Sequence, residues 1–157
     1  MNDSKLGEFI SDIRIRFEKG DETVNVKLAE RHHMELVQAI YRAIAAGDID
    51  AFRDALSNEI EFEIIGPADI PFAGRAKGPG DVVLLVTGNF DQIESQHPEV
   101  LDVVAQGDTV VVNGREHGRL RGAESDYEID WVQRFRFRNE ELVFFKQVYS
   151  RTIPQDG

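Results

Sequence analysis

The sequence contains no cysteine among its 157 residues. This absence excludes disulfide bonds, thiolate ligands for a metal and a cysteine nucleophile. A chain of this length does not need covalent cross-links, because a domain of about 150 residues buries roughly 70% of the surface that its unfolded chain exposes. With 41% hydrophobic and 30% charged residues, the composition is typical of a soluble globular domain.

Long apolar stretches are also missing. No run approaches the roughly 20 apolar residues that a helix needs to span a membrane. The N-terminus, MNDSKLGEF, lacks the apolar core of a secretory signal. We therefore expect a cytoplasmic protein with no membrane partner.

Positive charge is scarce. The chain has 18 Lys and Arg against 29 Asp and Glu, for a formal net charge of −11. Such a surface repels phosphate backbones, so we expect no nucleic-acid partner. The basic residues gather in two alternating runs, at 115–121 and 134–138, and this pattern is typical of one solvated face of a sheet.

The usual motifs of metal, phosphate and serine-nucleophile sites are absent. The four histidines show no HxxxH or HExxH spacing, which argues against a metal site. The glycine-rich stretch 74–80 lacks the GxxxxGK[ST] order of a phosphate loop, and no GxSxG nucleophile elbow occurs. We expect neither a metal nor a cofactor.

The patterns that are present predict one α+β domain over residues 29–153, with an N-terminal extension at 1–28 and a tail at 154–157. Apolar spacing in the extension fits either a helix or a pair of strands, and it slightly favours the helix.

In the domain, helical patterns come first: a helix over 29–46, a short helix after the N-cap residue Asp48, and a third helix over 81–90. A strand at 60–65 and a long loop at 66–80 separate the second helix from the third. A turn at His97-Pro98 follows the third helix. Four strand patterns come after it, at 100–105, 109–121, 125–138 and 142–151. This order favours a curved antiparallel sheet with about three helices packed on one face and a pocket enclosed between them.

Alternation along the strands predicts which side chains face that pocket, because successive side chains point to opposite faces of a sheet. In 125–138, Gln133 is the one polar residue on an otherwise apolar face. In 109–121, the apolar face carries Glu116 between Gly114 and Gly118, where the lack of side chains leaves room for a ligand. In 142–151, Gln147 faces inward if the face that carries Tyr149 is the buried one.

A carboxyl group in an apolar enclosure has a raised pKa, which suits a general acid or base near neutral pH. The sequence therefore indicates Glu116 as a proton-transfer group. Two alternatives stay open for it: pairing with a neighbouring arginine, or contact with solvent at the rim. Gln133 and Gln147 also have a purely structural interpretation, as core residues that form hydrogen bonds.

Four segments carry a resemblance to a known family: the helix–Gly47-Asp48–helix start, the loop with Pro71-Phe72-Ala73-Gly74, and the segments 131–137 and 141–149 near the end. They resemble the nuclear-transport-factor-2-like superfamily, especially its SnoaL-like (polyketide-cyclase-like) members, which are related to ketosteroid isomerases. The resemblance covers roughly residues 30–151. It implies a cone-shaped α+β barrel, an internal pocket between sheet and helices, and a homodimer.

The resemblance also places the superfamily's functional positions on this chain. The base carboxylate of ketosteroid isomerases falls at Ile64, their oxyanion-binding aspartic acid at Gln133, and their tyrosine near Ile40, next to Tyr41. These replacements argue against steroid isomerisation in its usual form.

Limonene-epoxide-hydrolase-like members use two aspartates and an arginine, which fall at Glu116, Gln147 and Gly114. One of these three roles is retained, so that hydrolase activity is also not expected in its usual form. The resemblance and the strand alternation agree in bringing Glu116, Gln133 and Gln147 to the pocket.

The leading hypothesis is a cofactor-independent acid–base enzyme that isomerises, cyclises or hydrates a hydrophobic small molecule. Glu116 would move the proton, and Gln133 and Gln147 would orient the substrate or a water. Aromatic side chains would form the wall of the pocket: Tyr41, Tyr127, Trp131, Phe135 and Tyr149. The alternatives are a non-catalytic binding module and an association domain that uses its arginine-rich sheet face.

Overall fold

The computed structural model describes residues 28–153, so the predicted tail and all of the predicted extension except Leu28 lie outside the described residues. In chain order the elements are α2 (Leu28–Ala46), α3 (Ile49–Asp54), β1 (Leu56–Ile65), β2 (Gly74–Lys77), α4 (Pro79–Asp91), β3 (Ile93–Gln106), β4 (Thr109–Leu120), β5 (Tyr127–Arg138) and β6 (Glu141–Arg151).

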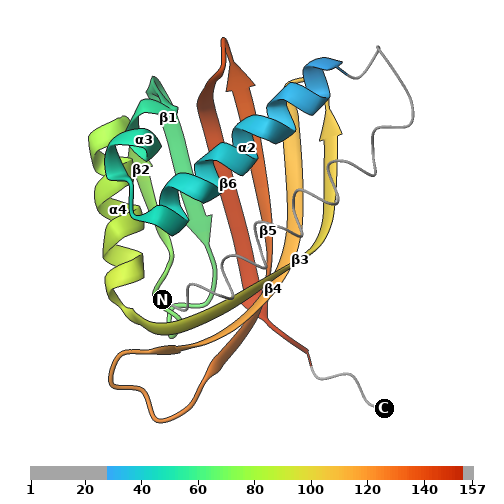
Figure 1. The fold of residues 1–157 in the computed structure, drawn as a ribbon. Coiled ribbons are helices and arrows are strands. Elements are labelled where there is room, and N and C mark those ends of the chain that lie inside the picture. Colours follow the sequence, from blue (N-terminus) through green and yellow to red (C-terminus); the bar gives the residue numbers. More distant parts are fainter. Residues whose placement is uncertain (1–27, 154–157) are drawn as a thin grey trace.

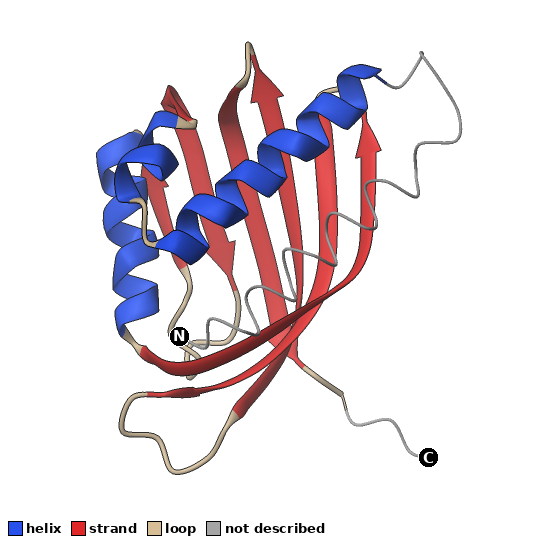
Figure 2. Cartoon of the chain, in the orientation of Figure 1, coloured by secondary structure: helices blue, strands red, loops and turns tan. Residues whose placement is uncertain are grey.

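The six strands form one curved sheet in the order β2-β1-β6-β5-β4-β3. The described helices all lie on the concave side of this sheet (Figure 1). Helix α2 runs across the concave face, and α4 lies beside β1 and β2. The predicted α+β cone is therefore confirmed. The sheet does not close into a barrel, because β2 and β3 remain as its two edges (Figure 2).

Three details of the sheet differ from the sequence predictions. The strands β1 and β6 are parallel, so the sheet is mixed rather than wholly antiparallel. The loop predicted for 66–80 contains the short edge strand β2, whose four residues are too few to show an alternating pattern. The third difference concerns His97 and Pro98, which were predicted to form a turn but lie within β3. Proline is tolerated there because β3 is an edge strand. On the free side of an edge strand no neighbouring strand needs the N–H group that proline lacks.

The helices follow the predicted pattern closely. The apolar stripe of α2 buries Val37, Ile40 and Tyr41. Asp48 is the N-cap of α3, and its side chain accepts a hydrogen bond of 3.0 Å from the backbone N–H of Ala51. None of the described helices is long and apolar enough to cross a membrane.

The alternation predicted for the central strands is confirmed. On β4 the inner face, which carries Val110, Val112 and Glu116, is buried. On β5 the buried face carries Tyr127, Ile129, Trp131, Phe135 and Phe137.

The prediction that Gly114 and Gly118 leave room for a ligand is wrong. A Cβ atom added to Gly114 would lie 2.2 Å from the Trp131 ring. One added to Gly118 would lie 2.3 Å from the Ser95 carbonyl oxygen and 2.7 Å from the Tyr127 hydroxyl oxygen. Gly114 and Trp131 are direct cross-strand partners, and so are Gly118 and Tyr127. The missing side chains of the glycines therefore make room for the two large rings of the neighbouring strand.

This packing predicts that Gly114→Ala destabilises the fold. The added methyl group overlaps the Trp131 ring, and overpacking of this kind typically costs about 1–3 kcal/mol of unfolding free energy. Chemical denaturation of both proteins measures the difference. The matched control is Gly88→Ala in α4, where a Cβ atom meets nothing within 4 Å; it should be neutral, or stabilising by up to about 1 kcal/mol. Equal stabilities for the two variants would contradict the packing argument.

Candidate functional site

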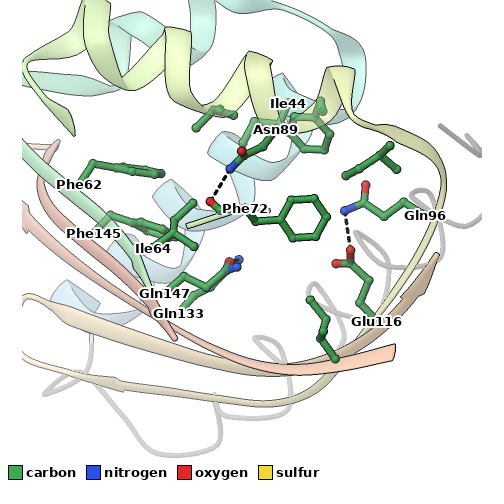
Figure 3. Close-up of a pocket in the computed structure, with 14 residues that line it drawn as sticks. Ile44, Phe62, Ile64, Phe72, Asn89, Gln96, Glu116, Gln133, Phe145 and Gln147 are labelled. Carbon is green, nitrogen blue, oxygen red and sulfur yellow. Dashed lines mark hydrogen bonds between the residues drawn. The ribbon is translucent and has the colours of Figure 1, made fainter. Parts of the chain in front are cut away.

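A cavity of about 140 Å³ lies between the inner face of the sheet and the helices. Its wall is mainly apolar and includes Ile44, Ile64, Phe62, Phe72, Phe90 and Phe145. Five polar side chains line it as well: Asn89, Gln96, Glu116, Gln133 and Gln147 (Figure 3). The three residues that the sequence predicted to meet inside the fold therefore do line one cavity.

Glu116 is buried, with 7% of its surface exposed. The Tyr127 hydroxyl donates a hydrogen bond of 2.6 Å to its Oε2 atom, and the Gln96 Nε2 donates one of 3.1 Å to the same oxygen. Burial raises the pKa of Glu116 above its ordinary value, because the charged form is desolvated. The hydrogen bonds from Tyr127 and Gln96 and the nearby His117 oppose this rise without cancelling it.

The alternative in which Glu116 pairs with a neighbouring arginine is not what the structure shows. Arg115 forms its ion pair with Asp130, at 3.0 Å, and both of these side chains are exposed. Arg119 pairs with Asp126 at 2.8 Å. Glu116 thus keeps neutral hydrogen-bond donors as its partners.

Gln133 and Gln147 face each other across β5 and β6 as direct cross-strand partners. The Gln133 Nε2 donates a hydrogen bond of 2.7 Å to the Gln147 Oε1. The Tyr41 hydroxyl of α2 donates to the Gln133 Oε1. Burial raises the pKa of Tyr41 well above its ordinary value, so this phenol keeps its proton and acts as the donor.

The aromatic residues predicted for the wall have different positions. Phe135 and Tyr41 line a smaller cavity of about 50 Å³, which shares Gln133 with the larger one. Tyr127 lines neither cavity, and its hydroxyl instead donates a hydrogen bond to Glu116. Trp131 and Tyr149 line neither of these two cavities, so the sequence prediction for their part of the wall is not supported.

The physical reason is that each of these two rings fills the space over a glycine. Trp131 covers Gly114, and Tyr149 covers Gly66. The Tyr149 hydroxyl also binds the loop between β1 and β2: it donates to the carbonyl oxygens of Pro67 and Ile70 and accepts from the backbone N–H of Phe72. Its role in the described structure is to hold this loop.

Sequence reasoning missed Gln96 and Asn89. Gln96 was overlooked because His97-Pro98 was interpreted as a turn, whereas alternation counted back from the buried Val100 would have placed it on the inner face. Asn89 donates a hydrogen bond of 2.9 Å from Nδ2 to the carbonyl oxygen of Phe72, which ties α4 to the loop. No alternation marks a residue of this kind, because its partner is a backbone atom.

Asp69, in the loop between β1 and β2, forms an ion pair with Arg151. Among the residues described, no three His, Asp or Glu side chains are grouped so that they could hold a metal ion.

The hydrogen bond from Tyr127 predicts a measurable effect on Glu116. Tyr127→Phe removes a donor that favours the charged carboxylate, so the pKa of Glu116 should rise further above its ordinary value. Carbon-13 NMR titration of the Glu116 carboxyl measures this, with Glu116→Gln to assign the signal. The control is Tyr149→Phe, which removes a hydroxyl bonded to Pro67 and Ile70 and should leave that pKa unchanged. An unchanged or lower pKa in Tyr127→Phe would contradict the assignment.

Comparison with known proteins gives the family of this chain. A SnoaL-like domain matches residues 37–145, which is more than half of the chain. Comparison with functionally curated proteins gives no match.

Similar solved structures share the fold at low sequence identity. One is an NTF2-like protein from Burkholderia xenovorans LB400, with 22% identity and a TM-score of 0.67, covering 78% of this chain and 92% of that one. A second is a protein from Catenulispora acidiphila DSM 44928 with a ketosteroid isomerase-like fold, in complex with trimethylamine (18% identity, TM-score 0.62, 74% and 85% covered). A third is TerC co-crystallised with polyporic acid (18% identity, TM-score 0.61, 75% and 91% covered).

These matches confirm the resemblance drawn from the helix start, the loop and the last two strands. The chain belongs to the SnoaL-like family and has the NTF2-like fold.

Proposed function

We propose that this protein binds a small hydrophobic molecule in the 140 Å³ cavity and moves a proton on it through Glu116, without a cofactor. The observation that carries the proposal is a buried carboxyl group with a raised pKa, facing an apolar cavity. The fold neighbour co-crystallised with polyporic acid supports a small-molecule ligand. A cytoplasmic location stays a prediction from the sequence.

The proposed chemistry is general acid–base catalysis of an isomerisation, cyclisation or hydration. The ionised Glu116 accepts a proton from the substrate and returns it at another atom. Tyr127 and Gln96 hold the carboxyl in one orientation through its Oε2. Gln147, oriented by Gln133, binds substrate oxygen through its amide group. The apolar wall excludes water, which strengthens each of these polar interactions.

This proposal predicts that the protein catalyses exchange of carbon-bound protons in a small ring enone. The probe is 3-methylcyclohex-2-enone in D₂O, followed by proton NMR. Glu116→Gln should lower the exchange rate by about 10²- to 10⁴-fold, which is the usual contribution of a positioned acid–base group. The rate in the unmodified protein should increase with pH up to the raised pKa of Glu116, because the ionised carboxyl is the base.

The control is Glu63→Gln, which removes a carboxylate that is paired with Arg75 and does not line this cavity. It should leave the exchange rate unchanged. Equal rates for Glu116→Gln and the unmodified protein would rule out Glu116 as the proton-transfer group.

A non-catalytic binding module is the second candidate. It is favoured by the fact that Glu116 is the only ionisable side chain among the described residues that line the cavity. Under this function Glu116→Gln would bind small ring molecules as the unmodified protein does, and neither protein would exchange their protons.

We also propose that the outer face of the sheet pairs with a second copy of the chain. Ile65, Val148 and Val132 lie side by side across β1, β6 and β5, and each is more than 40% exposed. On the same face, Arg134 and Arg136 lie over the Phe144 ring, at 5.6 and 5.3 Å. A row of exposed apolar side chains on a sheet is typical of an interface.

This predicts a dimer that dissociates when the apolar row receives a charge. Light scattering coupled to size-exclusion chromatography should show the unmodified chain at twice its 17.8 kDa mass and Val148→Lys at the monomer mass. The control is Leu84→Lys on α4, where Leu84 is 70% exposed outside the row, and it should stay dimeric. A monomeric unmodified protein would refute the interface.

A further inference from the structure

The two amides at one end of the cavity form a hydrogen-bond chain with a single direction. Tyr41 donates to the Gln133 Oε1, so the NH₂ group of Gln133 is the part that remains for Gln147. It donates to the Gln147 Oε1 over 2.7 Å. The Gln147 amide then has its NH₂ group left for the cavity, and an amide NH₂ can only donate. This end of the cavity therefore offers a hydrogen-bond donor to a ligand.

The other end has the opposite polarity. Both donors to Glu116 bind Oε2, and its Oε1 accepts no hydrogen bond from the described residues. Gln96 uses its Nε2 for Glu116, while its buried Oε1 has no hydrogen-bond partner in the described part of the chain. Figure 3 shows the Gln96 nitrogen turned to Glu116 and its oxygen turned away. This end lacks a hydrogen-bond donor, and a buried acceptor that is left without a donor lowers the stability of the fold.

The strand register separates the two ends. Glu116 lies opposite Ile129 in β5, and Gln133 lies four residues further along that strand, opposite Gln147. Four residues of strand span about 13 Å at the backbone. Apolar side chains, among them Phe72 and Ile129, line the cavity as well.

The volume of the cavity limits the ligand. At about 140 Å³ it is similar to an engineered apolar cavity of about 150 Å³ in another protein that binds benzene. A single six-membered ring with small substituents matches this size.

We propose that the substrate class is a single-ring molecule with a hydrogen-bond donor at one end and a carbonyl oxygen at the opposite end. The donor binds the Oε1 of Glu116, and the carbonyl accepts from Gln147. Tyr41 and Gln96 are positioning residues: Tyr41 sets the direction of the amide chain, and Gln96 holds the Glu116 carboxyl through its Oε2, which leaves Oε1 for the donor. This inference rests on the proposed function, because it concerns the same cavity.

Three probes of similar size test the polarity: 4-hydroxycyclohexanone, 4-methylcyclohexanone, which lacks the donor, and 4-methylcyclohexanol, which lacks the carbonyl. None of them titrates near neutral pH. NMR titration of the full chain gives each Kd, and the side-chain N–H signals of Gln147 report the site. 4-Hydroxycyclohexanone should bind about tenfold more tightly than either of the other two probes, since each of these leaves one polar group of the cavity unpaired.

Two variants should separate the two ends. Tyr41→Phe removes the hydrogen bond that fixes the Gln133 amide, so both amides can exchange the positions of their oxygen and nitrogen atoms. The preference for 4-hydroxycyclohexanone over 4-methylcyclohexanol should then fall to about twofold or less, while the preference for 4-hydroxycyclohexanone over 4-methylcyclohexanone remains about tenfold. Gln96→Leu should lower the preference over 4-methylcyclohexanone to about twofold or less and leave the preference over 4-methylcyclohexanol at about tenfold. The reason is that it removes one of the two donors that hold the Glu116 carboxyl. A purely structural role would weaken all three probes equally. Gln147→Leu replaces Tyr41→Phe if thermal unfolding shows that the latter is not folded.

The outcomes distinguish this inference from the function on which it rests. Equal binding of the three probes would overturn the polarity and leave a small-molecule cavity in place. Loss of both preferences in each variant would overturn the assignment of one residue to each end. Failure of all three probes to bind would overturn the inference and the proposed cavity function together.

Discussion

The register of β4, β5 and β6 is the constraint on which the rest of the structure depends. Gly114 lies opposite Trp131, Glu116 opposite Ile129, and Gln133 opposite Gln147. Because side chains alternate, a shift of one residue would turn the inner set of a strand to the outside. The fit of the Trp131 ring over Gly114 opposes such a shift, since any other residue at 114 would overlap the indole. The same pairing that fills the core thus brings the polar residues to one cavity.

Polar groups inside such a core are stable only when their partners are also supplied by the fold. Tyr41 reaches Gln133 from a helix, and Tyr127 and Gln96 reach Glu116 from the strands on either side of β4. The Glu116 Oε1 accepts no hydrogen bond from the described residues, and a ligand in the cavity can satisfy it. This combination of satisfied and unsatisfied groups is what makes the cavity a candidate site rather than a packing defect.

Much of this arrangement could be predicted from local patterns. The stripe of α2, the cap at Asp48 and the inner positions of Glu116 and Gln133 all follow from spacing within one element. The errors occur where an element depends on a distant one. Pro98 is compatible with a strand only because β3 is an edge, and β2 exists because β1 offers it an edge to pair with.

The sequence by itself determined the class of the fold, the alternation of inner and outer faces along the central strands, and the inner positions of Glu116 and Gln133. These follow from periodicities of 2 and 3.6 residues, which are properties of single segments. Only the tertiary structure decided that Trp131 and Tyr149 pack over glycines, that Gln96 joins Glu116, and that the amides point one way. The reason is that these contacts join residues of different elements, and pairing across the sheet, not spacing along the chain, selects which side chains touch.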